Sequence, residues 1–423
     1  MKRLLLLLFL GYVLGANAQR SLDDFLHQAV LTSPMIKTSK QSKLLNEQEQ
    51  LRLKALYTHA RWELTGDLLF VPILSTDNGK TRFKADAQSA GDYYGYDLGQ
   101  SSSHLNAGIQ VIQPLTGQYA YRNSQKILSI QDALSDDNIQ LTTHELQRQV
   151  TEQYLLCLLD QQNVALCHTI DSLLLRQEST VRALSRQGLV SPTDVHLLEI
   201  ERKNNADQRL TALQDYENHY ADLNVLCGTH DTLPLAPVTL TLTAPTNQPS
   251  AFLHQYQLKK QEAEAQYQSC LDAYRPQLSF YADAGSQTGT YLDFYKRWGV
   301  SAGLHLSWTL QDGQQLKRRR REMEISRETL DYQQHFVDQQ RQTRLRQLLQ
   351  LMKTQDKRIR QTDEQIRSYR VLLSDYEKEM MVGRRSVIDQ LKVFRDFHQA
   401  CTQRNLLNIN KQIQINTYHY WNW

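Results

Sequence analysis

Two long stretches of this chain contain neither glycine nor proline, and they limit the possible folds more than any other feature. One lies between Gly117 and Gly188 and the other between Gly313 and Gly383, so each is about 70 residues long. Helices in globular proteins run for about 8–20 residues, whereas a helix of this length extends for about 100 Å. Apolar residues recur in both at three- and four-residue spacing, as at Leu146, Val150, Tyr154 and Cys157. Such narrow seams predict helices that pack against other helices in an extended array.

Shorter helical patterns flank the two long ones at corresponding places. They cover residues 35–60, 193–226, 250–274 and about 386–416. Each short pair adds up to nearly the length of one long helix, so we expect two short helices to stack end to end beside each long one. Ser21 and Asp24 also form a possible capping box, which predicts a small N-terminal helix before Pro34.

Strand patterns occur in pairs, one pair before each long stretch. The four candidates are residues 62–70, 105–111, 278–284 and 298–310. Each is about ten residues long with alternating apolar and polar side chains, which is typical of a transmembrane β-strand. Trp298 and Trp308 are spaced to reach the two aromatic girdles of a membrane. A soluble hairpin with one solvated face is the alternative.

The strands are too few to close a membrane barrel within one chain. The smallest such barrel has about eight strands, and open sheet edges are not tolerated in lipid. Three chains would supply twelve strands and twelve helical columns. The predicted fold class is therefore mainly α with transmembrane β: a homotrimeric membrane β-barrel with four strands per chain, continuous with a long α-helical barrel and built from two internal repeats.

The first residues have the pattern of a secretory signal. Lys2 and Arg3 precede an apolar run that ends before Ala16-Asn17-Ala18, a small-x-small cleavage site. Removing the signal lowers the formal net charge from +3 to +1, which gives no support for a nucleic-acid partner. No later apolar run is long enough for a transmembrane helix, so an exported chain of this kind enters a membrane with strands.

These patterns divide the chain into four segments. They are residues 1–18, the signal peptide; 19–228, a first structural repeat of short helix, helix, β-hairpin, long helix and helix; 229–248, a linker; and 249–423, a second repeat of helix, β-hairpin, long helix, helix and C-terminal tail.

No motif for catalysis or metal binding stands out. The chain has no HExxH, no GxSxG and no phosphate-binding glycine loop, and its 13 histidines are scattered without ligand spacing. The five cysteines form neither a disulfide framework nor a zinc pattern, which leaves small buried hydrophobic residues as the interpretation; they are Cys157, Cys167, Cys227, Cys270 and Cys401. We therefore expect no enzyme, with no catalytic residues, no cofactor and no metal.

A set of short motifs, in order along the mature chain, resembles the TolC-like outer membrane efflux protein family. The motifs are SLDDFLHQAVLTSPMI at 21–36, QPLTG at 113–117, QGLVSPTDV at 187–195, LCG at 226–228, RPQL at 275–278, TLQDG at 309–313 and VGRRSVID at 382–389. They are similar to the family's opening helix, its strand-to-helix junctions, its two periplasmic turns, the end of its first repeat and its strand entry.

The resemblance implies a trimeric channel-tunnel in the outer membrane that extends into the periplasm. Its partners would be a periplasmic adaptor (membrane fusion) protein, an inner-membrane transporter and outer membrane lipids, and its function the passive export of solutes from a tripartite efflux pump. The outer-membrane component of a type I protein secretion system is an alternative. A periplasmic coiled-coil binding protein without a barrel is a second alternative, from a different class.

The resemblance also assigns a gate to the periplasmic tip. The tip turns contain Gly188, Pro192 and Gly383. Asp389 matches a position where the family places acidic residues at the pore entrance, and a ring of three carboxylates favours cations. Arg385 matches an arginine that holds the tip closed, with Asp194 as its expected partner. A helix cap after Pro192 is the alternative for Asp194, and a solvated turn charge is the alternative for Arg385 and Asp389. Lys392 stands where the family often has a second acid, and Met380 stands where it often has an aromatic residue.

Two further segments have distinctive compositions. The basic run at 317–321 lies near a helix start, where positive charge opposes the helix dipole. Its position beyond Trp308 points to phosphate headgroups, with an ordinary solvated face as the alternative. The aromatic ending TYHYWNW at 417–423 is a candidate for docking against the helical region or for a role in membrane assembly.

Overall fold

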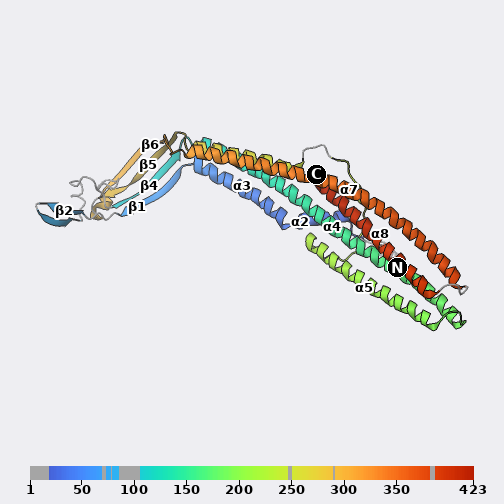
Figure 1. Ribbon diagram of the computed structural model, residues 1–423. Helices are drawn as coiled ribbons and strands as arrows, with labels where there is room; N and C mark the ends of the chain where they lie inside the picture. Colours follow the sequence, from blue (N-terminus) through green and yellow to red (C-terminus); the bar gives the residue numbers. More distant parts are fainter. Residues whose placement is uncertain are drawn as a thin grey trace, which may run out of the picture. The chain divides into compact units, whose positions relative to one another are not determined.

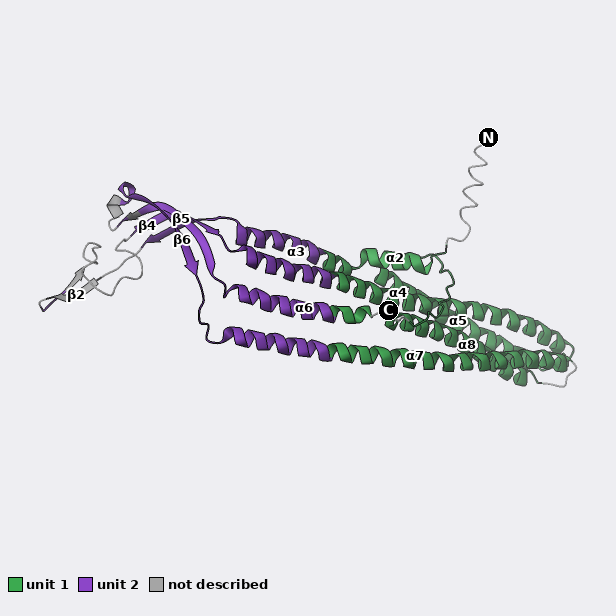
Figure 2. Cartoon of the chain, turned by 90° about the horizontal axis from the view of Figure 1, so that it is seen from above, with its two compact units in different colours: residues 1–40, 136–255, 333–423 green, residues 41–135, 256–332 purple. Residues whose placement is uncertain are grey.

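The computed structural model describes residues 19–68, 73–77, 79–84, 105–245, 250–288, 291–381 and 386–423. Its contacts divide the chain into two compact units (Figure 2), of which one comprises residues 1–40, 136–255 and 333–423 and the other residues 41–135 and 256–332. The helices are α2 (Leu22–Thr32), α3 (Pro34–Thr58), α4 (Gln118–Arg186), α5 (Pro192–Cys227), α6 (Ala251–Asp272), α7 (Gln315–Met381) and α8 (Val387–Trp421), with a 3-10 turn η2 (Tyr291–Lys296). The strands are β1 (Arg61–Leu68), β2 (Ile73–Asp77), β3 (Lys80–Lys84), β4 (Leu105–Pro114), β5 (Gln277–Thr288) and β6 (Trp298–Ser307).

The two glycine- and proline-free stretches form single helices, α4 with 69 residues and α7 with 67. Gly188 ends α4 with φ at +72°, a left-handed conformation that glycine adopts without strain. Its N–H donates to Ser185 O and the next N–H, of Leu189, donates to Leu184 O, each over 3.0 Å. Two carbonyls that the helix end leaves unpaired are satisfied in this way, which explains the sharp stop.

The other ends follow equally local rules. Asp312 precedes α7 and accepts hydrogen bonds from the N–H groups of Gln314 and Leu316, at 2.9 and 2.7 Å. Ser21 and Asp24 form the predicted capping box of α2. The helix α8 continues to Trp421, beyond the predicted end near residue 416, because its aromatic residues pack instead of forming a separate tail.

The first unit is a helical bundle with three apolar cores. One core joins α2, α4 and α5 around the fully buried Tyr154, whose hydroxyl donates to Ala236 O over 2.5 Å. Cys157 and Cys227 are buried in the same core, and burial raises their thiol pKa values to about 12 and about 11. The predicted role of the cysteines as buried hydrophobic residues therefore holds for these two and for Cys167, whereas the other two are half-buried.

The second unit contains a four-stranded antiparallel sheet and the helix segments attached to it (Figure 1). The strand order is β1-β4-β5-β6, so the two predicted hairpins join through β4 and β5. Between the helices, Ile130 of α4 packs against Leu258 and Ala265 of α6. The strands β2 and β3 form a separate two-stranded sheet. Within the part of the chain that the structure describes, no helix combines the length and the apolar stretch that crossing a bilayer requires.

Candidate functional site

One face of the four-stranded sheet is apolar from edge to edge. Strand pairing places Leu64, Ile109, Ala284 and Val300 in one row across β1, β4, β5 and β6. The outer members of that row are 83% and 85% exposed. Because side chains alternate along a strand, every second residue of each strand joins this face. An exposed apolar surface of this extent indicates contact with a membrane or with another protein.

The opposite face of the sheet is polar. Its central row contains Glu63, Gln110, Asp283 and Ser301, one from each strand. Ser301 Oγ donates to Asp283 Oδ2 over 2.6 Å, which links β6 to β5 through side chains. The sheet thus has one face suited to an apolar environment and one suited to water.

The two tryptophans chosen from the sequence lie at opposite ends of β6. Trp298 begins the strand and its ring N–H donates to Tyr295 O; Trp308 follows the last strand residue and donates to Tyr274 O, both over 3.2 Å. Their exposed fractions are 72% and 58%. Each ring therefore has its N–H hydrogen-bonded and most of its surface exposed, which suits the role that tryptophan has at membrane interfaces.

A row of glycines crosses the polar face of the sheet. Gly108, Gly285 and Gly299 are paired on β4, β5 and β6. A Cβ atom at Gly285 would lie 2.5 Å from Ala107 O and 2.6 Å from Gly108 Cα, closer than such atoms approach. The backbones of β4 and β5 therefore converge on the polar side, as they do where a sheet coils toward that face.

The first tip turn is held by a capping box. Ser191 is the N-cap of α5 and Pro192 its first residue, where the missing N–H costs nothing. Asp194 Oδ2 accepts from the Ser191 backbone N–H over 3.2 Å. The half-buried Asp194 thus has a structural role at the helix start, in addition to the gating role predicted from the resemblance, which stays a prediction.

The second tip turn has an acid at the equivalent position, but this acid is exposed and its side chain is not hydrogen-bonded to any described residue. Ser386 is the N-cap of α8, so Asp389 occupies the same third helical position as Asp194. Asp389 is exposed and makes no hydrogen bond or ion pair with any residue that the structure describes. Arg385 and Gly383 lie outside the described residues, so the pairing predicted between Arg385 and Asp194 stays untested.

Sequence reasoning missed the apolar core behind these turns. It contains Ile170, Leu174, Val181 and Leu184 of α4, Val195 and Leu198 of α5, Ile366 and Met380 of α7, and Val387, Leu391, Phe394 and Phe397 of α8. Met380, noted above for replacing an aromatic residue, is buried there. Gln390 is 1% exposed, and neither its amide nitrogen nor its amide oxygen has a hydrogen-bond partner in the described part of the chain.

A buried carboxylate links α4 to α5 near the tip, and no pattern in the sequence predicts it. Glu178 of α4, with 10% of its side chain exposed, pairs with Arg182 at 2.6 Å and with Arg202 of α5 at 3.0 Å. The hydrogen bond from Arg182 comes first among the causes that lower the pKa of Glu178 below its ordinary value of 4.5, and Arg202 adds to it.

Glu178→Gln is expected to lower the free energy of unfolding by about 1.5 kcal/mol at neutral pH. This value is at the low end of the range for hydrogen bonds to a charged group, because both arginines are partly exposed. A lowered folded pKa means that this stabilisation is complete above pH 4.5 and is lost as the pH falls through the folded value. Parent and variant should therefore converge in acid. Urea unfolding in detergent, followed by circular dichroism across this range, tests this, with the exposed Glu364→Gln as control. A pH-independent difference would contradict it.

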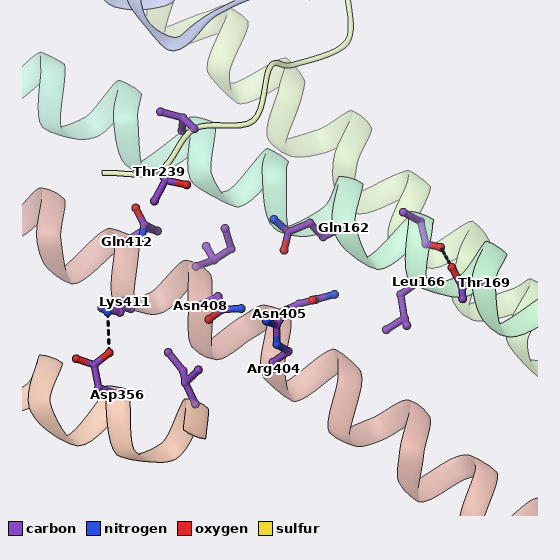
Figure 3. A pocket seen from close by; sticks show the side chains of 14 residues that line it. Gln162, Leu166, Thr169, Thr239, Asp356, Arg404, Asn405, Asn408, Lys411 and Gln412 are labelled. Carbon is purple, nitrogen blue, oxygen red and sulfur yellow. Dashed lines mark hydrogen bonds and ion pairs between the residues drawn. The ribbon is translucent and has the colours of Figure 1, made fainter. Parts of the chain in front are cut away.

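A polar groove of about 630 Å³ crosses α8 between α4 and α7 (Figure 3). Lys411 of α8 pairs with Asp356 of α7 at 2.6 Å, and Gln412 of α8 accepts from the backbone N–H of Leu240 in the linker. The groove thus has helical walls and a linker segment at one end. Among the described residues, no group of three or more His, Cys, Asp or Glu is placed to hold a metal ion.

No protein-family model matches the chain, and no curated protein matches it in sequence. Solved structures do resemble it. The CusC structure, described in connection with transmembrane channel formation, has a TM-score of 0.73 at 11% identity and covers 96% of this chain and 92% of its own. The outer membrane protein VceC from Vibrio cholerae gives 0.69 at 11%, with 95% and 96% covered. The outer membrane channel CmeC from Campylobacter jejuni gives 0.67 at 11%, with 95% and 85% covered. The chain therefore has the fold of the TolC-like outer membrane efflux proteins that its sequence motifs resemble.

Proposed function

We propose that this protein is an outer-membrane channel-tunnel that assembles as a homotrimer. The observation that carries the proposal is the sheet, which has a continuous exposed apolar face and two open edges. Among the described strands, β1 pairs only with β4 and β6 only with β5. Unpaired edge groups are not tolerated in lipid, and a soluble protein protects such edges. Three four-stranded sheets joined through these edges would form a closed twelve-stranded wall.

The curvature of the sheet supports the same arrangement. The close approach of Gly108 and Gly285 lies on the polar face, so coiling turns that face inward. In a closed barrel the polar row with Glu63, Gln110 and Asp283 would line the lumen, and the apolar row would face lipid. Trp298 and Trp308 would then belong to the two aromatic girdles.

The helices would continue this wall as a periplasmic tube. Within their units, α5 packs beside α4, and α8 beside α7, as the contacts of Arg202 with Asp171 and of Arg404 with Asp363 show. Two internal repeats, with the short helices stacked beside each long one, would give four helical columns per chain. A tube of this kind would receive solutes from an inner-membrane transporter through a periplasmic adaptor protein and release them outside the cell.

The tip turns would form the gate of the tube. Asp389 is exposed and free of contacts with the described residues, as a carboxylate at a pore entrance requires. Three copies would form an acidic ring that favours cations. Asp194 would combine its capping role with an ion pair to Arg385, which would favour the closed tip and keep the open state brief when no adaptor is bound.

The decisive experiment is to purify the mature chain in detergent, image it and record its conductance in a planar bilayer. We expect threefold particles and discrete ion-conducting steps that favour cations. A mature chain released by osmotic shock as a water-soluble single copy would refute the channel and favour the coiled-coil binding protein. Threefold particles that adsorb to the bilayer without conducting would refute the channel function alone.

A further inference from the structure

The helix ends next to the sheet carry more positive charge than their own acids neutralise. The acids in the last ten residues of α3 and the first ten of α7 all form ion pairs within their own helix. Glu49 pairs with Arg52, Glu322 with Arg319, and Glu324 with Arg320 and Arg321. Five cations of this region remain exposed, and their side chains make no hydrogen bond or ion pair with any residue that the structure describes. They are Lys54 of α3, Arg122 and Lys126 of α4, and Lys317 and Arg318 of α7, and we call them the basic collar.

The start of α7 shows that local helix energetics do not explain this charge. Five consecutive cations, 317–321, occupy the first two turns, where the positive end of the helix dipole disfavours them. At about 100° per residue they also surround the helix completely, so some of them face outward in any packing arrangement. Glu322 and Glu324 compensate Arg319, Arg320 and Arg321, so Lys317 and Arg318 are the cations for which an anion outside the chain would supply the compensation.

The surroundings of the collar identify the kind of anion. The collar lies where the helices of this unit meet the sheet (Figure 2), one to two turns beyond its apolar face. Trp308 marks the same boundary, and Tyr119 of α4 stacks with Arg275 at 5.0 Å. The protein surface changes from apolar to aromatic to cationic along this direction. A bilayer changes in the matching order, from hydrocarbon through the interface to the phosphates.

We propose that the basic collar binds the phosphate headgroups of anionic lipids in the leaflet that faces the helices. This inference rests on the proposed membrane function of the sheet and adds a lipid preference to it. Lys317 and Arg318 are the central pair, because both lie on the helix that directly follows β6. A juxtamembrane cation contributes about 1 kcal/mol to the attraction of an anionic surface, equivalent to about a fivefold preference.

The test compares two charge-matched double variants of the full mature chain. One is Lys317→Gln with Arg318→Gln, and the control is Arg358→Gln with Arg360→Gln, exposed residues of the same helix in the other unit. Each protein is placed in nanodiscs of phosphatidylglycerol and phosphatidylcholine in equal amounts. It is then recovered in mild detergent, and the retained lipids are quantified by mass spectrometry.

We expect the parent and the control to retain phosphatidylglycerol in excess, and the collar variant, which lacks two of the cations, to lose this preference by about 30-fold. Equal retention of both lipids by the parent would overturn the proposal, as would an equal loss in both variants. If the collar variant loses its threefold assembly but retains the same ratio of lipids, the cations bind a neighbouring copy of the chain instead, and the proposal is overturned. Conductance in pure phosphatidylcholine tests the channel function separately from the lipid binding. A parent that conducts but shows no lipid preference refutes lipid binding by the basic collar and leaves the channel function intact.

Discussion

Gly285→Ala is expected to abolish assembly of the channel, although it adds only one methyl group. The new Cβ atom would lie 2.5 Å from Ala107 O and 2.6 Å from Gly108 Cα, and both are backbone atoms of β4 that no side-chain rotation can move away. The strands would have to separate at the centre of the sheet. Overpacking of this kind costs about 3 kcal/mol or more, and a trimer would incur it three times.

Gly299→Ala is the matched control for this prediction. Gly299 pairs with Gly285 in the same row, on the edge strand β6, but a Cβ atom there would meet nothing within 4 Å. The measurement is the yield of detergent-resistant trimer, with circular dichroism to verify that the helices still form. We expect almost no trimer for Gly285→Ala and parental yield for Gly299→Ala. Parental yield for both variants would contradict the close approach of β4 and β5.

The long helices were predictable because their cause is local. An absence of glycine and proline between Gly117 and Gly188 removes every residue that would break a helix, and a narrow apolar seam then fixes the packing face. The strand pattern at 298–310 was predictable for the same reason, since alternation is visible residue by residue. The observed strand ends at Ser307, and Trp308 and Leu310 lie beyond it. Local patterns therefore gave the elements and placed the boundaries within a few residues.

Apart from the local β2–β3 hairpin, which was not among the predicted strands, the features that sequence reasoning missed depend on contacts between distant segments. Glu178 pairs with Arg202 across 24 positions, and nothing near either residue predicts that α4 and α5 bring them together. The groove around Lys411 and Asp356 exists only because three helices and the linker meet there. The extension of α8 belongs to the same class: His144 of α4 stacks on Tyr420 and Trp423, at 5.1 and 4.2 Å between ring centres, and so holds residues that look like a tail.

The second large prediction concerns Asp194 at the tip. One substitution can separate its capping of α5 from its proposed ion pair with Arg385. Glutamine at the third helical position also completes a capping box, so Asp194→Gln keeps the helix start while it removes the charge that would pair with Arg385. An ion pair of this kind contributes about 1 kcal/mol. If the three copies open together, the loss of about 3 kcal/mol raises the ratio of open to closed tips by about 100-fold.

Ser191→Ala is the complementary variant. It removes the side chain that accepts from the Thr193 N–H over 3.2 Å and keeps the Asp194 charge. This change is expected to cost about 1 kcal/mol of stability and to leave the open probability of single channels at the parental value. Asp194→Gln is expected to do the reverse, with near-parental stability and a large rise in open probability. An open probability that rises in both variants would mean that the fold of the turn alone closes the tip. An open probability that rises in neither would exclude Asp194 from the gate, because its charge is absent from one variant and its cap is weakened in the other.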